Sequence, residues 1–360
     1  MMSLIFWLLA AVLGIATVLP LLRLRHWFVR GLDFPRLQLL IMIGITIVSA
    51  ALLSMGNLSL PVLWWMLMIA CLLAQCWWIW PNSTLHKTEV PGANDALRAS
   101  GQRLSLITSN VLQTNRDATT LVQQIEQLRP DVVITLESDA WWETQLNAAL
   151  TAYPHRVACA LDNQYGLHIF SRLPLDNERI EYLVEPDVPS ASAHVLLSDN
   201  TRVHLHVVHP RPPAPGENTS SVERDVELLV LAREIETLDV PVIVTGDLND
   251  VAWSRTTRLF RRVSRLLDVR TGRGMFNTFN ADYWFARWPL DHVFVSSHFR
   301  VGKIQRLEHI GSDHFPMYVE LLLTAPGNID APEALKPSEH DLIQDTLKTP
   351  EAQQSETPRL

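Results

Sequence analysis

The stretch "GSDHFPMYVE", from Gly311 to Glu320, places an ionisable pair directly in front of an apolar strand pattern. The alternating run from Met317 onward has the period of two that is typical of a β-strand. Asp313 and His314 therefore stand at the tip of an element that we expect to be buried and rigid. Side chains on such a tip are held in fixed positions, as catalytic and binding groups must be.

Polar residues also stand at the ends of several other apolar strand patterns. These patterns are "RLSLITSNV", "DVVITLE", "RVHLHVVHP", "VPVIVTGDLND" and "LDHVFVSS". Taken singly, each polar residue has an ordinary explanation as a turn amide, a helix cap or a loop histidine. Their repetition predicts that they converge at one mouth of a sheet. They are Asn110, Glu137, His209, Asp247 with Asn249, and Asp291 with His292.

Between Leu104 and Leu323 the strand patterns alternate with helical ones. "ATTLVQQIEQLRP" and "SVERDVELLVLAREIETL" have the spacing of amphipathic helices, and "DVVITLE" is apolar throughout, as a strand buried on both faces would be. The sequence predicts a mixed α/β domain over residues 102–324.

The N-terminal region contains three uncharged apolar runs, Leu4–Leu22, Leu37–Met55 and Leu60–Trp80. Each has about the ~20 residues needed to cross the hydrocarbon core of a bilayer. A signal peptide is a poor explanation of the first run, because it lacks a basic start and a small-residue cleavage site and two further runs follow. We expect residues 1–80 to form a membrane anchor of three transmembrane helices, which makes the chain an integral membrane protein.

The arginines of the first loop indicate an orientation. Arg23, Arg25, Arg30 and Arg36 lie between the first two runs, whereas the second loop, "GNLSLP", is uncharged. The positive-inside rule puts the arginine-rich loop, and with it everything after Trp80, in the cytoplasm. A periplasmic location stays open, because "LRLRHWFVRGLDF" could instead lie flat on the membrane surface.

Two polar segments flank the α/β region. Residues 81–101 are expected to form a linker, and residues 325–360, which are polar and rich in proline, are expected to form a largely disordered tail. The formal charge of −8 argues against a general nucleic-acid binder. The three cysteines supply neither a disulfide framework nor a cysteine-based zinc site.

The inventory of polar strand ends favours one kind of chemistry. Several carboxylates from distant elements, without a cysteine, suit Mg²⁺ or Mn²⁺ better than zinc. Histidines paired with aspartates can stabilise a phosphoryl transition state or protonate a leaving oxygen. The set fits metal-assisted attack of water on a phosphoester.

The motifs, in this order along the chain, resemble the endonuclease/exonuclease/phosphatase superfamily, the deoxyribonuclease I-like group. They are "TSNVLQTN", "PDVVITLES", "YGLHIFSRLPL", "HVVHP", "VTGDLND", "LDHVFVS" and "GSDHFPMYVEL". The resemblance implies a four-layer α/β sandwich in which two packed mixed sheets are flanked by helices. The apolar N-terminus also resembles a membrane-attached bacterial branch, which implies the bacterial inner membrane.

The resemblance also implies a role for each strand-end residue. Glu137, Asn110 and Asp313 match the metal site, Asp247 the residue that orients or deprotonates the attacking water, and Asn249 the amide that holds the phosphate. His314 matches the histidine on the scissile phosphate, Asp291 the aspartate that fixes its tautomer, and His209 the histidine that assists the leaving group. His292 should face the other side of its strand and be structural.

Two further segments bear on the substrate. The resemblance implies that the loop "GRGMFNTFNADYWFARWPLDH" shapes specificity, although its aromatics, Phe279, Tyr283, Trp284 and Trp288 among them, could simply pack together. The abasic-site repair branch carries an acidic residue where this chain has Leu112, which argues against that role. In the run "SRTTRLFRRVSRLLDVRTGR", the arginines could attract a polyanion or anionic headgroups, or could balance nearby acids.

The sequence therefore predicts a membrane-anchored, Mg²⁺- or Mn²⁺-dependent phosphoesterase of the phosphodiesterase or nuclease type. Its substrate would be a nucleic acid, a phospholipid or a soluble phosphate ester. The alternative is a catalytically inactive, membrane-tethered binding or scaffold module of the same fold.

Overall fold

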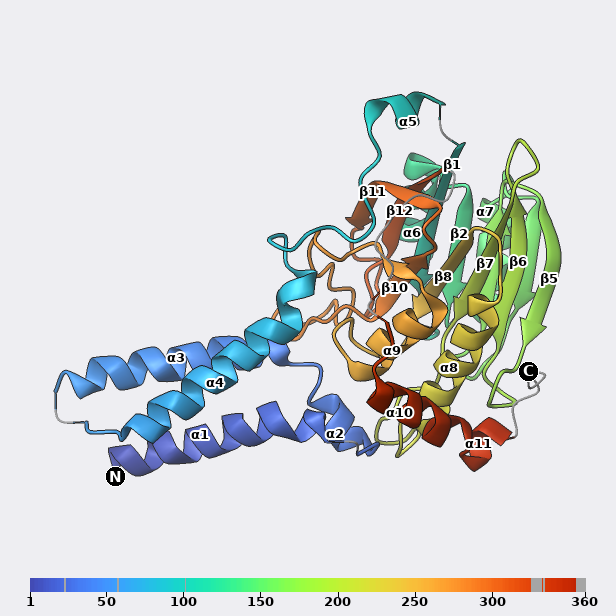
Figure 1. The fold of residues 1–360 in the computed structure, drawn as a ribbon. Coiled ribbons are helices and arrows are strands. Elements are labelled where there is room, and N and C mark those ends of the chain that lie inside the picture. The colour runs from blue at the N-terminus through green and yellow to red at the C-terminus, as the bar shows by residue number, and fades with distance from the viewer. Residues whose placement is uncertain (23, 57, 101, 325–331, 333, 354–360) are drawn as a thin grey trace.

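The structure is a computed structural model that describes residues 1–22, 24–56, 58–100, 102–324, 332 and 334–353. A helical arm, residues 2–82, extends from one end of an α/β domain (Figure 1). The arm consists of α1 (Met2–Val18), η1 (Leu19–Leu21), α2 (Trp27–Gly31), α3 (Arg36–Ser54), α4 (Val62–Ile79) and η2 (Trp80–Asn82).

Three helices of the arm are long and apolar enough to cross a membrane: Met2–Leu21, Arg36–Ser54 and Val62–Asn82. They coincide with the three runs predicted from the sequence. The helices pack through a narrow core that includes Ala10, Ile43, Trp64 and Met68, while much of their outer surface is exposed and apolar. Helices α3 and α4 each start directly after a proline, which is tolerated at a helix start and not in its interior.

The domain is built on two six-stranded sheets. The first contains, in spatial order, β11 (Phe299–Arg306), β12 (Met317–Leu323), β1 (Gln102–Asn110), β2 (Val132–Leu136), β4 (Leu167–Ser171) and β3 (His155–Cys159). The second contains β5 (Leu175–Glu181), β6 (Ser190–Leu196), β7 (Arg202–Val208), β8 (Val242–Asp247), β10 (Asp291–Val295) and β9 (Leu267–Asp268). Both are mixed sheets, because β1–β2 and β7–β8 are parallel and the other pairs are antiparallel.

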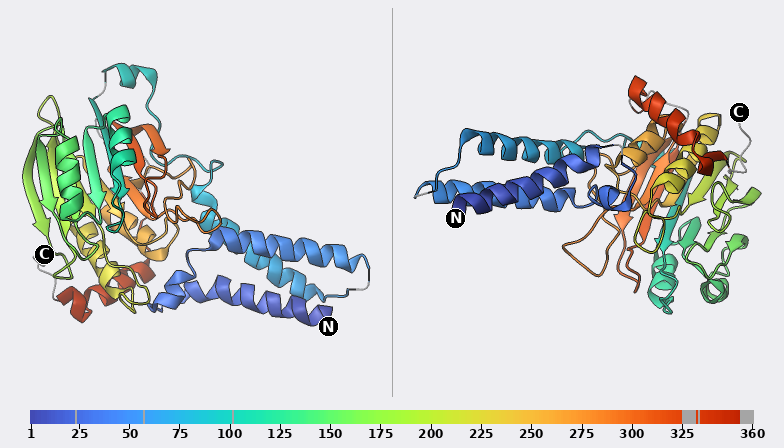
Figure 2. Two further views of the ribbon diagram at one scale, coloured as in Figure 1. Left: turned by 180° about the vertical axis from the view of Figure 1, so that it is seen from behind. Right: turned by 90° about the horizontal axis from the view of Figure 1, so that it is seen from below.

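The sheets pack face to face over an aliphatic core that includes Leu106, Ile134, Leu205 and Val293. Helices α6 (Thr119–Leu128) and α7 (Ala140–Ala149) cover the outer face of the first sheet. Helices α8 (Val222–Glu236) and α9 (Arg255–Ser264) cover the second, and Figure 2 shows the resulting layers from two sides. The predicted α/β sandwich flanked by helices is confirmed.

Some strands were not evident in the sequence. Strands β3 and β11 were missed because both lie at sheet edges and alternate buried with half-exposed or exposed residues. The segment "YGLHIFSRLPL", predicted as one strand, supplies β4 and the first residue of β5, which belong to different sheets.

The segments flanking the domain are in contact with it. Residues 83–100 run along the domain and include the short helix α5 (Asp95–Ser100), and the Ala93 amide donates to the Val301 carbonyl at 2.9 Å. The tail contains α10 (Pro337–Leu347) and α11 (Pro350–Gln353), which differs from the disorder expected there. Ile343 and Ala352 are buried against α8, so a short apolar stripe orders this part. The rest of the predicted tail, 325–331, 333 and 354–360, lies outside the described residues.

The arginines of α9 bind partners within the chain. Arg258 lies over the Trp78 ring at 3.9 Å, Arg261 pairs with Glu89, and Arg262 pairs with Glu339. Burial lowers the pKa of Arg258 to about 10. These contacts support the second of the two interpretations above, in which the arginines balance nearby acids.

Candidate active site

The central feature of the site is an imidazole between two carboxylates. Asp291 of β10 and Asp247 of β8 are register partners on antiparallel strands, which directs their side chains to the same face. His314, just before β12, enters between them from the other sheet. Its Nδ1 donates to Asp291 Oδ2 at 2.8 Å, and its Nε2 lies 3.4 Å from Asp247 Oδ2.

A glycine allows the next strand to come close to Asp247. Gly246 has a φ of +140°, and a Cβ at this position would lie 1.9 Å from the Val208 carbonyl oxygen. Because glycine has no Cβ, β7 and β8 can approach there. His209 follows β7 directly, and its Nε2 lies 3.9 Å from Asp247 Oδ2, with the Tyr165 ring beside it at 5.2 Å between centroids.

Asn110 connects the two sheets. It ends β1 and stands next to Glu137, which follows the parallel strand β2. The Asn110 Nδ2 donates to Glu137 Oε1 at 2.7 Å and to Asp247 Oδ2 at 3.3 Å. Glu137 is half-buried and has a φ of 56°, an uncommon backbone conformation that this site maintains.

Backbone and side-chain bonds fix the remaining residues. The Asn249 amide N–H donates to Asp247 Oδ1 at 2.8 Å, and its side chain donates to the Pro210 carbonyl at 3.0 Å. Ser312 was part of the quoted motif but was not predicted to act. Its hydroxyl donates to the Asn110 carbonyl at 2.8 Å and accepts from the His314 amide at 3.0 Å. Ser312 therefore links the last strand to the first.

The charges in the site are strongly coupled. Burial opposes protonation of His314, but Asp291 and Asp247 outweigh it and raise the pKa of the imidazole to about 10. Near neutral pH the ring is therefore an imidazolium that directs both N–H groups at carboxylates. Burial also raises the pKa of Asp313; His314 opposes this shift, and Glu137 and Asp247 add to it.

All eight residues predicted for the site lie together at the ends of these strands. Asn110, Asp247, Asp291, His209 and His314 are buried, whereas Glu137, Asn249 and Asp313 are half-buried. We refer to the solvent-accessible side of the site at these three residues as its opening. His292 lies apart, as its alternation predicts: its Nε2 donates to the Asp250 carbonyl at 2.9 Å, and its Nδ1 accepts from Arg270.

The cluster contains groups that could hold a metal ion. One ligand atom each from Asp247, Asp291 and His314 lies within 4.8 Å of the other two. In this set the Nδ1 of His314 is already hydrogen-bonded to Asp291, and its Nε2 faces Asp247. The opening also suits a hard cation. Asp313 Oδ1 is buried without a partner among the described residues, and Glu137 adds a second carboxylate.

The long loop before β10 packs against the site. Thr278 Oγ1 accepts from the Asp291 amide at 3.2 Å, and the Phe279 ring lies against His314 with 4.9 Å between centroids. Both residues belong to the segment that the sequence marked as shaping specificity. Phe279 shields the buried histidine, and Thr278 holds the backbone of its aspartate partner.

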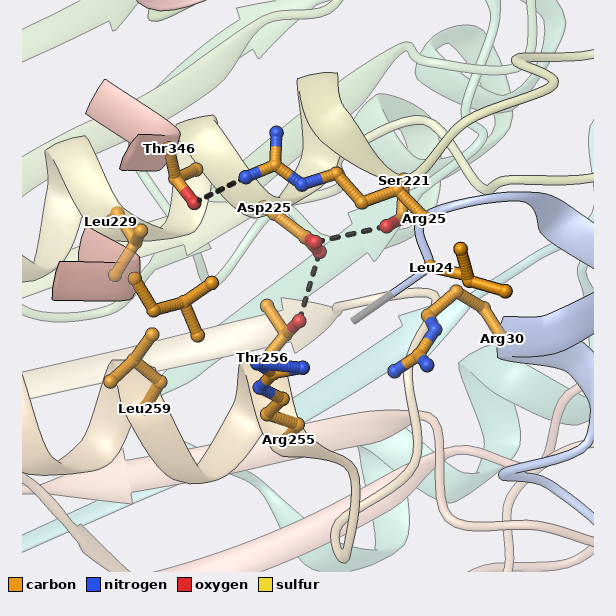
Figure 3. A pocket seen from close by; sticks show the side chains of 11 residues that line it. Leu24, Arg25, Arg30, Ser221, Asp225, Leu229, Arg255, Thr256, Leu259 and Thr346 are labelled. Carbon is orange, nitrogen blue, oxygen red and sulfur yellow. Dashed lines mark hydrogen bonds between the residues drawn. The ribbon is translucent and has the colours of Figure 1, made fainter. Parts of the chain in front are cut away.

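A small, partly open cavity lies elsewhere, between residues 24–30 of the arm and helices α8, α9 and α10 (Figure 3). Its volume of about 30 Å³ is the space of one or two waters. Asp225 accepts there from Ser221 at 2.9 Å and from Thr256 at 2.9 Å, and Arg25 donates to Thr346 at 3.0 Å. The cavity is a junction between arm and domain, too small for a phosphoester substrate.

The fold and the site define a class of protein that comparison with solved structures supports. The chain is similar to an endonuclease/exonuclease/phosphatase family protein from Bacteroides thetaiotaomicron, with a TM-score of 0.52, 20% identity, and coverage of 63% of this chain and 98% of that one. It is also similar to humanized D. rerio TDP2, with a TM-score of 0.51, 20% identity, and coverage of 61% of this chain and 98% of that one. The structure of D. rerio TDP2 complexed with a single-strand DNA product matches with a TM-score of 0.50 and 20% identity, and the match covers 61% of this chain and 98% of that one. At these identities the likeness establishes the fold.

The family is established by the sequence. Residues 107–314, more than half of the chain, match the model of the Endonuclease/Exonuclease/phosphatase family. The chain belongs to this family. No curated protein matches it.

Proposed function

We propose that the protein is a hydrolase of phosphoester bonds that uses a divalent cation, Mg²⁺ or Mn²⁺. The observation that carries the proposal is the imidazolium of His314 between Asp247 and Asp291, beside the carboxylates of Glu137 and Asp313. The positively charged imidazole can bind phosphate oxygens, and a carboxylate beside it can take a proton from water. Family membership supports the same reaction.

Glu137 and Asp313, with Asn110 beside them, would hold the cation. Their oxygens are the hard ligands that Mg²⁺ prefers, and Asp313 has a buried oxygen free to bind. When bound, the cation would neutralise charge on the phosphate oxygens and on the leaving oxygen. It would also keep Asp313 ionised, against the burial that raises its pKa.

The other residues would perform the proton transfers and position the phosphate. Asp247 would orient and deprotonate the attacking water, and its own orientation is fixed by the Asn249 amide. His314 would donate from Nε2 to a phosphate oxygen, and Asp291 would keep Nδ1 protonated. Asn249 would bind the phosphate through its side chain. His209, on the other side of Asp247, would protonate the leaving oxygen.

The arm would place this chemistry at a bacterial inner membrane. Three helices are long and apolar enough to cross a bilayer, and arginines of the first loop lie next to the domain. Arg25 donates to Thr346 of α10 at 3.0 Å, and Arg36 pairs with Asp33, whose carbonyl accepts from Trp253. The positive-inside rule then puts the catalytic domain in the cytoplasm. A nucleic acid is one candidate substrate, because a relative of the same fold was crystallised with a single-strand DNA product.

The test uses the full chain purified in detergent micelles. Hydrolysis of bis-p-nitrophenyl phosphate would be followed with Mg²⁺, with Mn²⁺ and with EDTA, and single-strand DNA would be assayed in parallel. We expect turnover that requires a cation and is abolished by EDTA. No turnover of either substrate with either cation would refute the proposal and favour an inactive scaffold module.

A further inference from the structure

The domain presents a group of exposed aromatic side chains at one place. Tyr283, Trp284 and Phe285 are 55%, 81% and 59% exposed, and we refer to them as the aromatic tip. On the described part of the chain after Trp80, the other exposed large apolar side chains are Leu85 and the less exposed Ile180. Contiguous exposed aromatics on a soluble surface usually mark a site of interaction.

The loop that carries the aromatic tip starts at the candidate active site. The Ala281 amide donates to the Asp313 carbonyl at 2.7 Å, and the Phe315 amide donates to the Thr278 carbonyl at 2.9 Å. Phe279 lies against His314. The tip and the opening of the site therefore belong to one structural unit.

The same loop is attached to the arm. Gln38, in the first turn of α3, donates from Nε2 to the Phe285 carbonyl at 2.9 Å. The rings of Phe34 and Trp288 meet edge to face at 5.7 Å. The indole of Trp253, just beyond Asn249, donates to the Asp33 carbonyl at 2.7 Å. Orange loops accordingly project from the domain beside the end of the blue helices (right-hand view of Figure 2).

In a bilayer that the arm crosses, the length of α3 would place these contacts at the surface. Its 19 residues, Arg36–Ser54, span about 28 Å at ~1.5 Å per residue. Because the hydrocarbon core of a bilayer is ~30 Å thick, the whole length of α3 is needed to cross it. The first turn of α3, where Gln38 holds the loop, then stands at the level of the headgroups. Tryptophan and tyrosine favour this level, because their rings are apolar and their N–H and O–H groups remain hydrated.

We propose that the aromatic tip inserts into the interface of the bilayer that the arm crosses, and that the site hydrolyses the phosphoester of a lipid in that bilayer. The second part rests on the proposed function. In the reaction, a water oxygen bonds to phosphorus, one P–O bond of the lipid breaks, Asp247 takes the proton of the water, and His209 protonates the leaving oxygen. Because the loop is hydrogen-bonded to Asp313 at its start, insertion of its tip would hold the opening of the site near the headgroups.

Insertion is tested without reference to activity. Trp284→Cys is made in full-length protein that also carries Cys76→Ser and Cys159→Ser, labelled with bimane and reconstituted into vesicles of brominated phosphatidylcholine. Ile180→Cys in the same background is the matched control, and the background protein without an added cysteine reports any label on the buried Cys71. We expect strong quenching at position 284 and little at 180. Equal, weak quenching at both positions would overturn insertion.

The lipid substrate is tested by turnover in vesicles of phosphatidylcholine, phosphatidylethanolamine and phosphatidylglycerol. Release of phosphorylated headgroups is compared with hydrolysis of bis-p-nitrophenyl phosphate by the same proteoliposomes. Replacing all three tip residues by serine should lower headgroup release at least tenfold more than hydrolysis of the soluble ester, and Ile180→Ser should change neither.

The outcomes separate the two claims. Hydrolysis of the soluble ester without headgroup release from these vesicles would contradict the lipid substrate and leave the proposed function standing. Hydrolysis of neither would refute the proposed function and the lipid substrate together, while the quenching result would still decide insertion.

Discussion

Asp247 and Asp291 stand directly opposite each other across the β8–β10 ladder, and the imidazole of His314 lies between their carboxylates. The pairing of two strands in one sheet thus sets the spacing of two negative charges, and a residue from the other sheet neutralises part of that charge. This arrangement raises the pKa of His314 to about 10, so the ring is charged before any substrate binds. In the proposed reaction, a phosphate entering the site would meet a preformed donor, which needs little reorganisation.

Replacing Asp291 should disable the histidine without unfolding the domain. Asp291→Asn keeps the shape but removes the charge that holds Nδ1 protonated, and we expect kcat to fall on the order of a thousand-fold. Asp176→Asn, at the half-exposed start of β5, removes a carboxylate that pairs with Arg202 and should leave the rate within about twofold. Hydrolysis rates and circular dichroism of the full chain check this. A comparable rate for the two variants would contradict the role of Asp291.

The metal site should depend on Glu137. Glu137→Gln removes one of the two carboxylates at the opening, and we expect the Mg²⁺ concentration for half-maximal rate to rise at least about tenfold. Glu236→Gln at the exposed end of α8 is the matched control. The readout is a metal titration of the rate, supported by calorimetry with Mn²⁺. An unchanged metal requirement would place the cation elsewhere, for instance at Asp247, Asp291 and His314.

His209 should matter most for substrates with poor leaving groups. A p-nitrophenolate leaves without a proton, whereas an alkoxide needs one. We expect His209→Ala to slow a dialkyl phosphate by about 10²-fold or more, and bis-p-nitrophenyl phosphate by less than about fivefold. Rates measured on both substrates give the ratio. Equal losses on the two would indicate that His209 serves binding or structure, through its neighbours Asp247 and Tyr165.

Stability should fall in mild acid because of buried neutral histidines. Burial lowers the pKa of both His206 and His292 to about 3 from an ordinary value of 6.5. Below pH 6.5 these histidines are therefore protonated in the unfolded chain but not in the folded chain. Each of them lowers the free energy of unfolding by about 1.4 kcal/mol for every pH unit that the pH falls. The loss continues until the pH reaches the folded pKa.

His206 offers the cleaner test of this dependence, since both of its ring nitrogens lack partners among the described residues. His206→Phe should flatten the decrease in melting temperature between pH 7 and pH 5, and the exposed His340→Asn should not. Thermal melts of the full chain in detergent provide the comparison. Parallel curves for His206→Phe and the unaltered chain would contradict a neutral buried His206.

Much of this site was visible in the sequence because strand tips are rigid. Asn110, Asp247 and His314 could be predicted to meet, since each follows or precedes a strongly apolar strand. The bonds among them could not be predicted. Ser312 looks like any loop serine until the structure shows its hydroxyl between Asn110 and His314. Edge strands β3 and β11 and helix α10 could not be predicted for a similar reason. Their apolar patterns are short, and these segments become ordered through tertiary contacts.

The attachment of the loop to the arm was equally hidden. The sequence marks Tyr283, Trp284 and Trp288 as an aromatic loop, but only the fold places that loop between His314 and the start of α3. The distance of nearly 250 residues between Gln38 and Phe285 along the chain leaves no local pattern for such a contact.

Phosphoester hydrolysis at this site is tested most directly by the Mg²⁺-dependent hydrolysis of bis-p-nitrophenyl phosphate by the full chain and by its Asp247→Asn and Asp176→Asn variants. We expect turnover that EDTA abolishes, a loss of at least about a thousand-fold for Asp247→Asn, and a nearly unchanged rate for Asp176→Asn. Turnover that persists in EDTA, or an Asp247→Asn variant as fast as Asp176→Asn, would contradict metal-dependent hydrolysis at this site.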